Sequence, residues 1–170
     1  MKHYYVMPDI HGHNKLLQKA LYDLYIQNPA GGKIIFLGDY IDRGPDNLGV
    51  IKTVMNPPAN WEFVCLLGNH ESMFLDAYHN KTRFYDFEAA IDLAEFGRDD
   101  LVKYDHVHQG INKDVITWMD NLKLFHIEDK NVFVHAYYDD TRSPDDQSES
   151  TCIWLRMSDF ETYHNDNQGL

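Results

Sequence analysis

The chain has 170 residues, of which 44% are hydrophobic and 25% are charged, a composition typical of a globular domain that excludes a fibrous or disordered protein. Its formal net charge of -12 would repel a phosphate backbone, so no nucleic acid partner is expected. Two cysteines, Cys65 and Cys152, are too few for a disulfide framework, and no apolar run suits a signal peptide or a membrane span. We therefore expect a single domain over residues 1–170, located in the cytoplasm, with no membrane partner.

The first part of the chain alternates predicted strands and helices. Residues 4–7 form a β-prone run, and the apolar spacing that follows predicts a helix with Asn14 as its N-cap. Residues 33–37 predict a buried strand, residues 45–55 a helix opened by Pro45, and residues 61–67 a third strand. Parallel strands need helical crossovers, so this order indicates an α/β fold.

The rest of the chain predicts helices, two short strands and a loop. Past His70, apolar residues recur at helical spacing in two stripes. The stripes consist of Phe84, Phe87, Ile91 and Ala94, and of Val115, Met119 and Leu122. Residues 124–127 and 131–136 predict strands, and the acidic, turn-rich residues 137–150 predict an exposed loop.

Polar residues follow four of the predicted strands at equivalent positions. The four motifs are DIHG at 9–12, GDYIDRG at 38–44, GNHE at 68–71 and VHA at 134–136. Ligand groups gather beyond the carboxyl ends of parallel strands, so we expect the motifs to meet there. Carboxylate, amide and imidazole groups together suit manganese, iron or zinc better than magnesium or calcium, and Asp39 could bridge two such ions. A pair of divalent ions is typical of phosphate ester chemistry.

Each motif alone also has an ordinary structural interpretation. Asp9 and His11 could form a polar turn, and Asp42 and Arg43 could be a surface ion pair that contributes almost nothing. His135 could be a histidine with satisfied hydrogen bonds at the end of a strand. Four such motifs in one order, each after a strand, favour a metal-dependent site instead.

The motifs DIHGH, GDYIDRG, GNHE and VHA resemble the four ordered motifs of the phosphoprotein phosphatase family, the metal-dependent serine/threonine phosphatases, in its compact bacterial and bacteriophage branch. The resemblance covers residues 4 to about 156. It implies a calcineurin-like metallophosphoesterase fold, in which helices flank a β-sandwich. It also implies Asp9 and His11 on a first divalent ion, Asp39 bridging two ions, and Asn69 and His135 on the second.

The resemblance further implies roles in catalysis and in substrate binding. His70 would be the general acid, oriented by Asp42, and a water or hydroxide activated by the metals would be the nucleophile. Arg43 and Arg156 would bind the phosphoryl oxygens, with Asn69 close to the same group. For Arg156, packing over a neighbouring tryptophan is the alternative.

The chain departs from the family pattern near its C-terminal end. Family members continue into a strand that ends in a GHTP-like turn, whose histidine completes the second metal site, and no such pair follows His135. His164 lies in a polar stretch without a preceding predicted strand, and we do not expect it to serve instead. We expect the full gene product to continue beyond residue 170, so that the C-terminal strands of the sandwich are missing from this sequence. The alternatives are a second metal held by fewer protein groups and a degenerate binding protein.

The resemblance implies hydrolysis of phosphomonoesters in phosphoserine or phosphothreonine proteins, or in small phosphoesters. Two divalent ions would serve as cofactors, Mn2+ in the first place and iron or zinc as alternatives. A dinucleoside tetraphosphate hydrolase, which cleaves a phosphoanhydride with the same ligands, is the main alternative function. Glu71 favours the phosphatase, because the other group more often carries aspartate there. A non-catalytic phosphate-binding relative is a third hypothesis, and the sequence does not predict the oligomeric state.

Overall fold

The computed structural model describes residues 4–80 and 110–159, which contain a parallel three-stranded sheet and an antiparallel two-stranded sheet. The parallel sheet has the order β1 (Tyr4–Met7), β2 (Gly32–Phe36) and β3 (Trp61–Cys65). Met7 pairs with Phe36, and Phe36 pairs with Cys65, so the three strands end at the same level. The loops that carry the first three motifs therefore leave the sheet at one edge.

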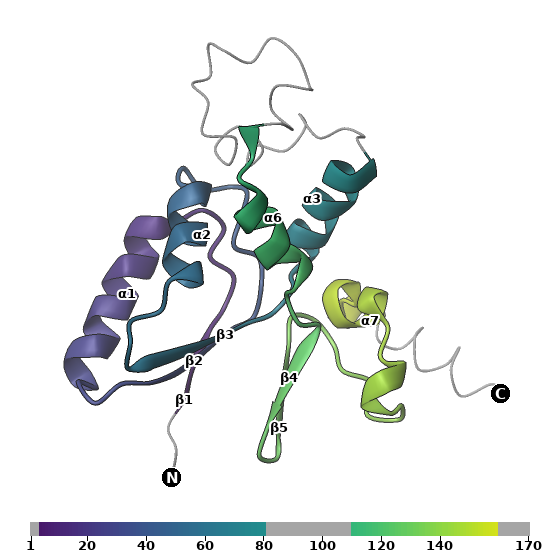
Figure 1. Cartoon of the computed structure of the whole chain (residues 1–170). Coiled ribbons are helices and arrows are strands. Elements are labelled where there is room, and N and C mark those ends of the chain that lie inside the picture. Colours follow the sequence, from purple (N-terminus) through teal and green to yellow (C-terminus); the bar gives the residue numbers. More distant parts are fainter. Residues whose placement is uncertain (1–3, 81–109, 160–170) are drawn as a thin grey trace, which may run out of the picture.

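Helices connect and cover these strands (Figure 1). α1 (Asn14–Gln27) joins β1 to β2, α2 (Asn47–Met55) joins β2 to β3, and α3 (Asn69–Asn80) follows β3. α1 packs against α2, and α3 packs against α6 (Lys113–Asp120). The predicted α/β layout with a parallel sheet is therefore confirmed. The predicted stripe of Phe84, Phe87, Ile91 and Ala94, and His164, lie outside the described residues.

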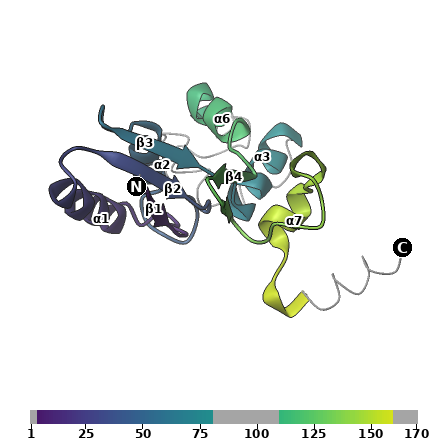
Figure 2. The same ribbon diagram turned by 90° about the horizontal axis from the view of Figure 1, so that it is seen from below.

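The second sheet is a hairpin of β4 (Phe125–Glu128) and β5 (Asn131–Val134). The remaining described elements are the 3-10 turns η3 (Pro144–Asp146) and η4 (Met157–Asp159) and the short helix α7 (Glu149–Trp154). The hairpin lies between the parallel sheet and α7, as the view from below in Figure 2 shows. This position brings the end of β5, where the fourth motif begins, towards the other three motifs.

The two faces of the parallel sheet bury different partners. Ile34 and Phe36 belong to the main core with α1, α2, α3 and α6, in which Phe74 is also fully buried. Ile35 and Val64 point to the opposite face, where Phe133 of β5 packs against them. Because side chains alternate along a strand, β2 is apolar on both faces, as a strand buried between two layers must be. The hairpin thus forms the second layer of a sandwich.

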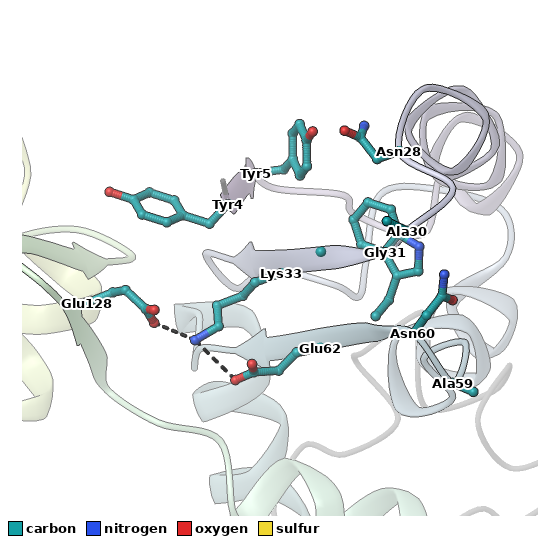
Figure 3. Close-up of a pocket in the computed structure, with 12 residues that line it drawn as sticks. Tyr4, Tyr5, Asn28, Ala30, Gly31, Lys33, Ala59, Asn60, Glu62 and Glu128 are labelled. Atoms are coloured by element: carbon teal, nitrogen blue, oxygen red, sulfur yellow. Dashed lines mark hydrogen bonds and ion pairs between the residues drawn. The ribbon is translucent and has the colours of Figure 1, made fainter. Parts of the chain in front are cut away.

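Charged groups also join the two sheets at the end opposite to the motifs. Lys33 Nζ of β2 lies 2.5 Å from a carboxylate oxygen of Glu128 in β4 and 3.3 Å from one of Glu62 in β3 (Figure 3). Beside this contact, the ring of Tyr4 meets the ring of Phe133 edge-on, with centroids 5.3 Å apart. The Lys33–Glu128 and Tyr4–Phe133 contacts hold the hairpin against the parallel sheet. Tyr4, Lys33, Glu62 and Glu128 also line a pocket of about 580 Å³ that no motif residue lines.

The structure corrects two predicted helix starts. The N-cap of α1 is His13 and not Asn14, whose side chain instead donates to Asp46 Oδ2 at 2.7 Å and accepts from Thr53. Pro45 does not open α2, because Asp46 is the N-cap of that helix and accepts from the backbone N–H of Gly49. The side chain of Asn14 thus makes a tertiary contact between α1 and α2 instead of capping its own helix, and the local sequence does not show this contact.

The acidic segment 137–150 is only partly the exposed loop that the sequence predicts. Asp139 is 2% exposed, accepts from the backbone N–H and hydroxyl of Thr141, and pairs with Arg142 at 3.1 Å. Gln147 closes the segment by donating to the backbone carbonyl of Asp139, and α7 begins at Glu149. Within the described residues, none of the helices has both the length and the apolar character that crossing a bilayer requires.

Candidate active site

Backbone hydrogen bonds join the first three motifs at the carboxyl edge of the parallel sheet. The N–H groups of Ile10 and His11 both donate to the carbonyl of Asp39 at 2.9 Å, and that of Gly12 donates to Tyr40 at 2.8 Å. The N–H of His70 donates to Asp39 Oδ1 at 3.1 Å. Asp39 therefore contacts both neighbouring motifs, one through its backbone and one through its carboxylate.

Some side chains of the second motif are buried in the core, and others face the site. Tyr40 and Ile41 are fully buried, and the Tyr40 hydroxyl donates to the carbonyl of Leu66 at 3.0 Å. Asp39 and Asp42, on either side of this pair, direct their carboxylates to histidines of the site. Burial of Tyr40 and Ile41 thus fixes the centre of the loop in the core, and the carboxylates on either side of this pair face the site.

The backbone of the site is unusual. His11, Asp39, Asp42 and Arg43 have φ values of 46°, 55°, 68° and 65°, in the left-handed region that non-glycine residues seldom adopt. Only one other non-glycine residue in the described part of the chain, Asp129, has a positive φ. Such conformations persist where the surrounding structure enforces them, and they concentrate at functional sites.

Two histidines lie close to the carboxylate of Asp39, each near a different oxygen atom. His11 Nε2 lies 3.4 Å from Asp39 Oδ2, and His135 Nε2 lies 3.6 Å from Asp39 Oδ1. The Asp9 carboxylate completes the cluster, at 3.9 Å from each of these two rings. Asp39 is shared by two groups in which the possible ligand atoms all lie within 4.8 Å of one another, His11 with His70 and Asp9 with His135.

The hydrogen bonds of His11 and His135 leave their Nε2 atoms available for a cation. Nδ1 of His11 lies 2.8 Å from the carbonyl of Ile41, and Nδ1 of His135 lies 2.9 Å from that of Leu37. A carbonyl only accepts, so each Nδ1 donates, and Nε2 of the neutral ring carries a lone pair. Backbone carbonyls orient metal-binding histidines in this way.

The Nε2 atom of His11 lacks a hydrogen bond although it is buried, which holds for no other buried side-chain nitrogen or oxygen atom among the described residues. Nε2 of His135 faces Asn69 Oδ1 at 3.0 Å, so two acceptors meet where a cation would satisfy both. Two carboxylates, two imidazoles and an amide oxygen form a donor set that suits a divalent transition metal. The residues present therefore fit the metal site that the sequence predicts.

His70 and Arg43 form a second part of the site. Nδ1 of His70 lies 2.7 Å from Asp42 Oδ2, and this hydrogen bond is the largest cause that raises the pKa of His70 above its ordinary value. Nη2 of Arg43, an exposed side chain, lies 3.1 Å from His70 Nε2. When His70 is protonated, both atoms are donors, and an oxyanion can accept from both.

The structure thus brings together every predicted site residue except Arg156, which is exposed after α7. None of the contacts within residues 4–80 and 110–159 joins Arg156 to the cluster, so its role stays a prediction. Sequence reasoning missed the structural part of Glu71, which is completely buried in α3. Its spacing from Phe74 and Ala77, the other buried residues of that helix, is the signal that could have indicated burial.

The layered fold and the paired carboxylate and histidine groups have the arrangement that the sequence analysis expects of a calcineurin-like metallophosphoesterase fold. The profile of the calcineurin-like phosphoesterase family matches residues 3–165, and the chain belongs to this family. A crystal structure described as a candidate diadenosine tetraphosphatase shares the fold, with a TM-score of 0.62 at 21% identity, over 90% of this chain and 58% of that chain. The predicted family and fold are thereby confirmed.

Curated relatives fall into two groups. Serine/threonine-protein phosphatase 2 of Escherichia coli (strain K12) is 42% identical over 77 residues, which are 45% of this chain and 33% of that protein. A symmetrical bis(5'-nucleosyl)-tetraphosphatase of Pseudomonas putida is 27% identical over 134 residues, which are 78% of this chain and 41% of that protein. The chain therefore spans between a third and about two fifths of the length of these relatives.

Proposed function

We propose that this protein hydrolyses phosphomonoesters with two divalent metal ions. The observation that carries the proposal is the pair of histidine Nε2 atoms that point at opposite oxygens of the Asp39 carboxylate, each oriented by a backbone carbonyl. Asp9 and His11 would hold one ion, Asn69 and His135 the other, and Asp39 both. Bound divalent ions polarise a phosphoryl group and provide a nucleophile from water at neutral pH.

The other residues of the site would act on the substrate directly. Arg43 would bind the phosphoryl oxygens, because it is exposed beside His70 and its planar guanidinium matches their geometry. His70 would donate a proton from Nε2 to the leaving oxygen, while Asp42 holds the other ring nitrogen and favours the charged form. Asn69 would add an amide near the same group.

Mn2+ is the ion that we propose first, and it should stabilise the folded protein. An ion that binds only the folded state at ~100 times its Kd adds ~2.7 kcal/mol to the free energy of unfolding. For a chain of this size that corresponds to a rise in Tm of ~5–10 °C. Differential scanning calorimetry of the metal-free protein with added MnCl2 measures it, and a chelator should reverse the rise. An unchanged Tm at saturating Mn2+ would contradict the proposed ligand set.

Phosphoserine or phosphothreonine in proteins is the substrate that we propose. The His70–Asp42 pair supports it, because an alkoxide is a poor leaving group and needs a proton. The 42% identity with a serine/threonine-protein phosphatase over 77 residues supports it as well. The alternative substrate, a dinucleoside tetraphosphate, is favoured by the longer match to the tetraphosphatases.

Phosphate release from a phosphoserine peptide, compared with nucleoside diphosphate release from diadenosine tetraphosphate, separates these two functions, because symmetrical hydrolysis of the dinucleotide yields two molecules of ADP and no phosphate. We expect kcat/KM for the phosphopeptide to exceed that for diadenosine tetraphosphate at least ~10-fold, which corresponds to a difference of ~1.4 kcal/mol in transition-state binding. An aryl phosphate serves as a general substrate in the same assay. Preference for diadenosine tetraphosphate would support the alternative, and Mn2+ binding without turnover of any of the three would support a non-catalytic relative.

A further inference from the structure

Glu71 is a carboxylate that the proposed reaction does not use. It lies in the first turn of α3, and its side chain is completely buried. It accepts hydrogen bonds from three consecutive backbone N–H groups of the second motif, those of Asp39 at 2.9 Å, Tyr40 at 2.8 Å and Ile41 at 3.1 Å. A buried carboxylate is tolerated in a protein when it is hydrogen-bonded in this way.

These three N–H groups belong to the segment in which the Asp39 backbone is left-handed, with a φ of 55°. Glu71 Oε2 holds the N–H of Asp39 itself, and Oε1 holds those of the next two residues. The Asp39 carbonyl is held separately, by the N–H groups of Ile10 and His11. The backbone N–H and the backbone carbonyl of Asp39 are thus both held by hydrogen bonds. This fixes its backbone conformation and therefore the direction of its carboxylate.

The close approach of α3 to this loop requires both the length and the two acceptor oxygens of Glu71. An added Cβ at Gly68 would lie 2.2 Å from the Asp39 nitrogen and 2.8 Å from Glu71 Oε2, so the turn already lies against the loop. Aspartate is one methylene shorter and would not reach all three N–H groups. Glutamine would reach them, but its amide N–H₂ would oppose one of these donors with another donor.

We propose that Glu71 is a positioning residue that sets the affinity of the site for divalent ions by fixing the backbone of Asp39. It acts through Asp39 and touches neither the ions nor the substrate. The inference rests on the metal ligands of the proposed function, but it does not require that the protein hydrolyse any particular substrate.

The variants Glu71→Gln and Glu71→Asp test this inference, with Glu62→Gln as the matched control, because Glu62 is an exposed glutamate of β3. Isothermal titration of the metal-free proteins with MnCl2 gives the affinity. Outer partners of metal ligands typically contribute 10–100-fold, so we expect Mn2+ to bind Glu71→Gln ~10–100-fold more weakly than the wild type. We expect the control to bind Mn2+ like the wild type.

Hydrogen exchange of the backbone amides of residues 39–41 in the metal-free protein is the second measurement. Glu71→Gln should exchange faster at these amides, while the amides of β2 keep their protection, which separates a local effect from a loss of the fold. If Glu71→Gln does not fold, Glu71→Asp carries the test with the same two measurements. Unchanged Mn2+ affinity, or unchanged exchange at residues 39–41, would overturn the inference. Wild type that binds Mn2+ without hydrolysis would instead overturn only the proposed function.

Discussion

Asp39→Asn is expected to lose most of its bound metal and nearly all of its turnover. Asp39 is 3% exposed, and both of its oxygens face a histidine, so its carboxylate is the one group common to both proposed ion positions. Asparagine keeps the shape of the side chain but removes its negative charge and one acceptor oxygen. Metal-ion catalysis contributes several kcal/mol to transition-state stabilisation.

For this variant we expect a fall in kcat of at least ~10³-fold, the equivalent of ~4 kcal/mol. Metal content after dialysis against Mn2+, measured by elemental analysis, should fall in parallel. Asp23→Asn is the matched control, because Asp23 is a half-exposed residue of α1 that pairs with Lys19 at 2.8 Å. Full metal content together with an unchanged rate in Asp39→Asn would show that the assigned cluster is not the active site.

His70→Asn is expected to separate chemistry from metal binding. The variant should keep its metal, because the proposed ligands remain, but lose the proton donor at the leaving oxygen. General acid catalysis typically contributes ~10²–10⁴-fold, so kcat on a phosphoserine peptide should fall by that factor. The loss should be much smaller on an aryl phosphate with a good leaving group. Equal losses on both substrates would mean that His70 does not donate the proton.

The dependence of this reaction on pH follows from the same pair. Hydrogen bonding to Asp42 raises the pKa of His70 above the ordinary value of 6.5, so His70 remains protonated to a higher pH than a free imidazole. The working form is the acid, so the rate on a phosphopeptide should decline as the pH rises through the pKa of His70. Asp42→Asn removes the charge that favours the acid form and should move this decline to lower pH.

The sequence was sufficient to predict the parallel sheet and the proximity of the candidate site residues, because both depend on local patterns. Apolar runs defined the strands, and each run ended in a polar motif, so a shared sheet edge placed Asp9, Asp39 and Asn69 together. His135 was predicted from its place after a strand, although it enters from the second sheet and depends on contacts such as that between Lys33 and Glu128.

What the sequence did not predict depends on contacts between residues that are distant in the chain. Asn14 is a good N-cap by composition, but Asp46 and Thr53 use its side chain, and the helix begins without it. In the sequence, Glu71 served only to distinguish between two related functions. Its structural role depends on three hydrogen-bond partners that lie 30 to 32 residues away in the chain. Burial of Asp139 is different, because it depends on contacts inside its own loop, such as that with Gln147, eight residues further on.

If the proposed activity is present, the apolar centre of the second motif limits how its substrate specificity could be re-engineered. Tyr40 and Ile41 have no exposed surface, whereas Arg43 and Pro45 in the same loop are exposed. An outward movement of the loop would expose the ring of Tyr40 to water, which is unfavourable. The loop is therefore expected to keep the same conformation when a substrate binds. A randomised library that aims at new substrates should therefore diversify positions 43 and 45 and leave 40 and 41 untouched.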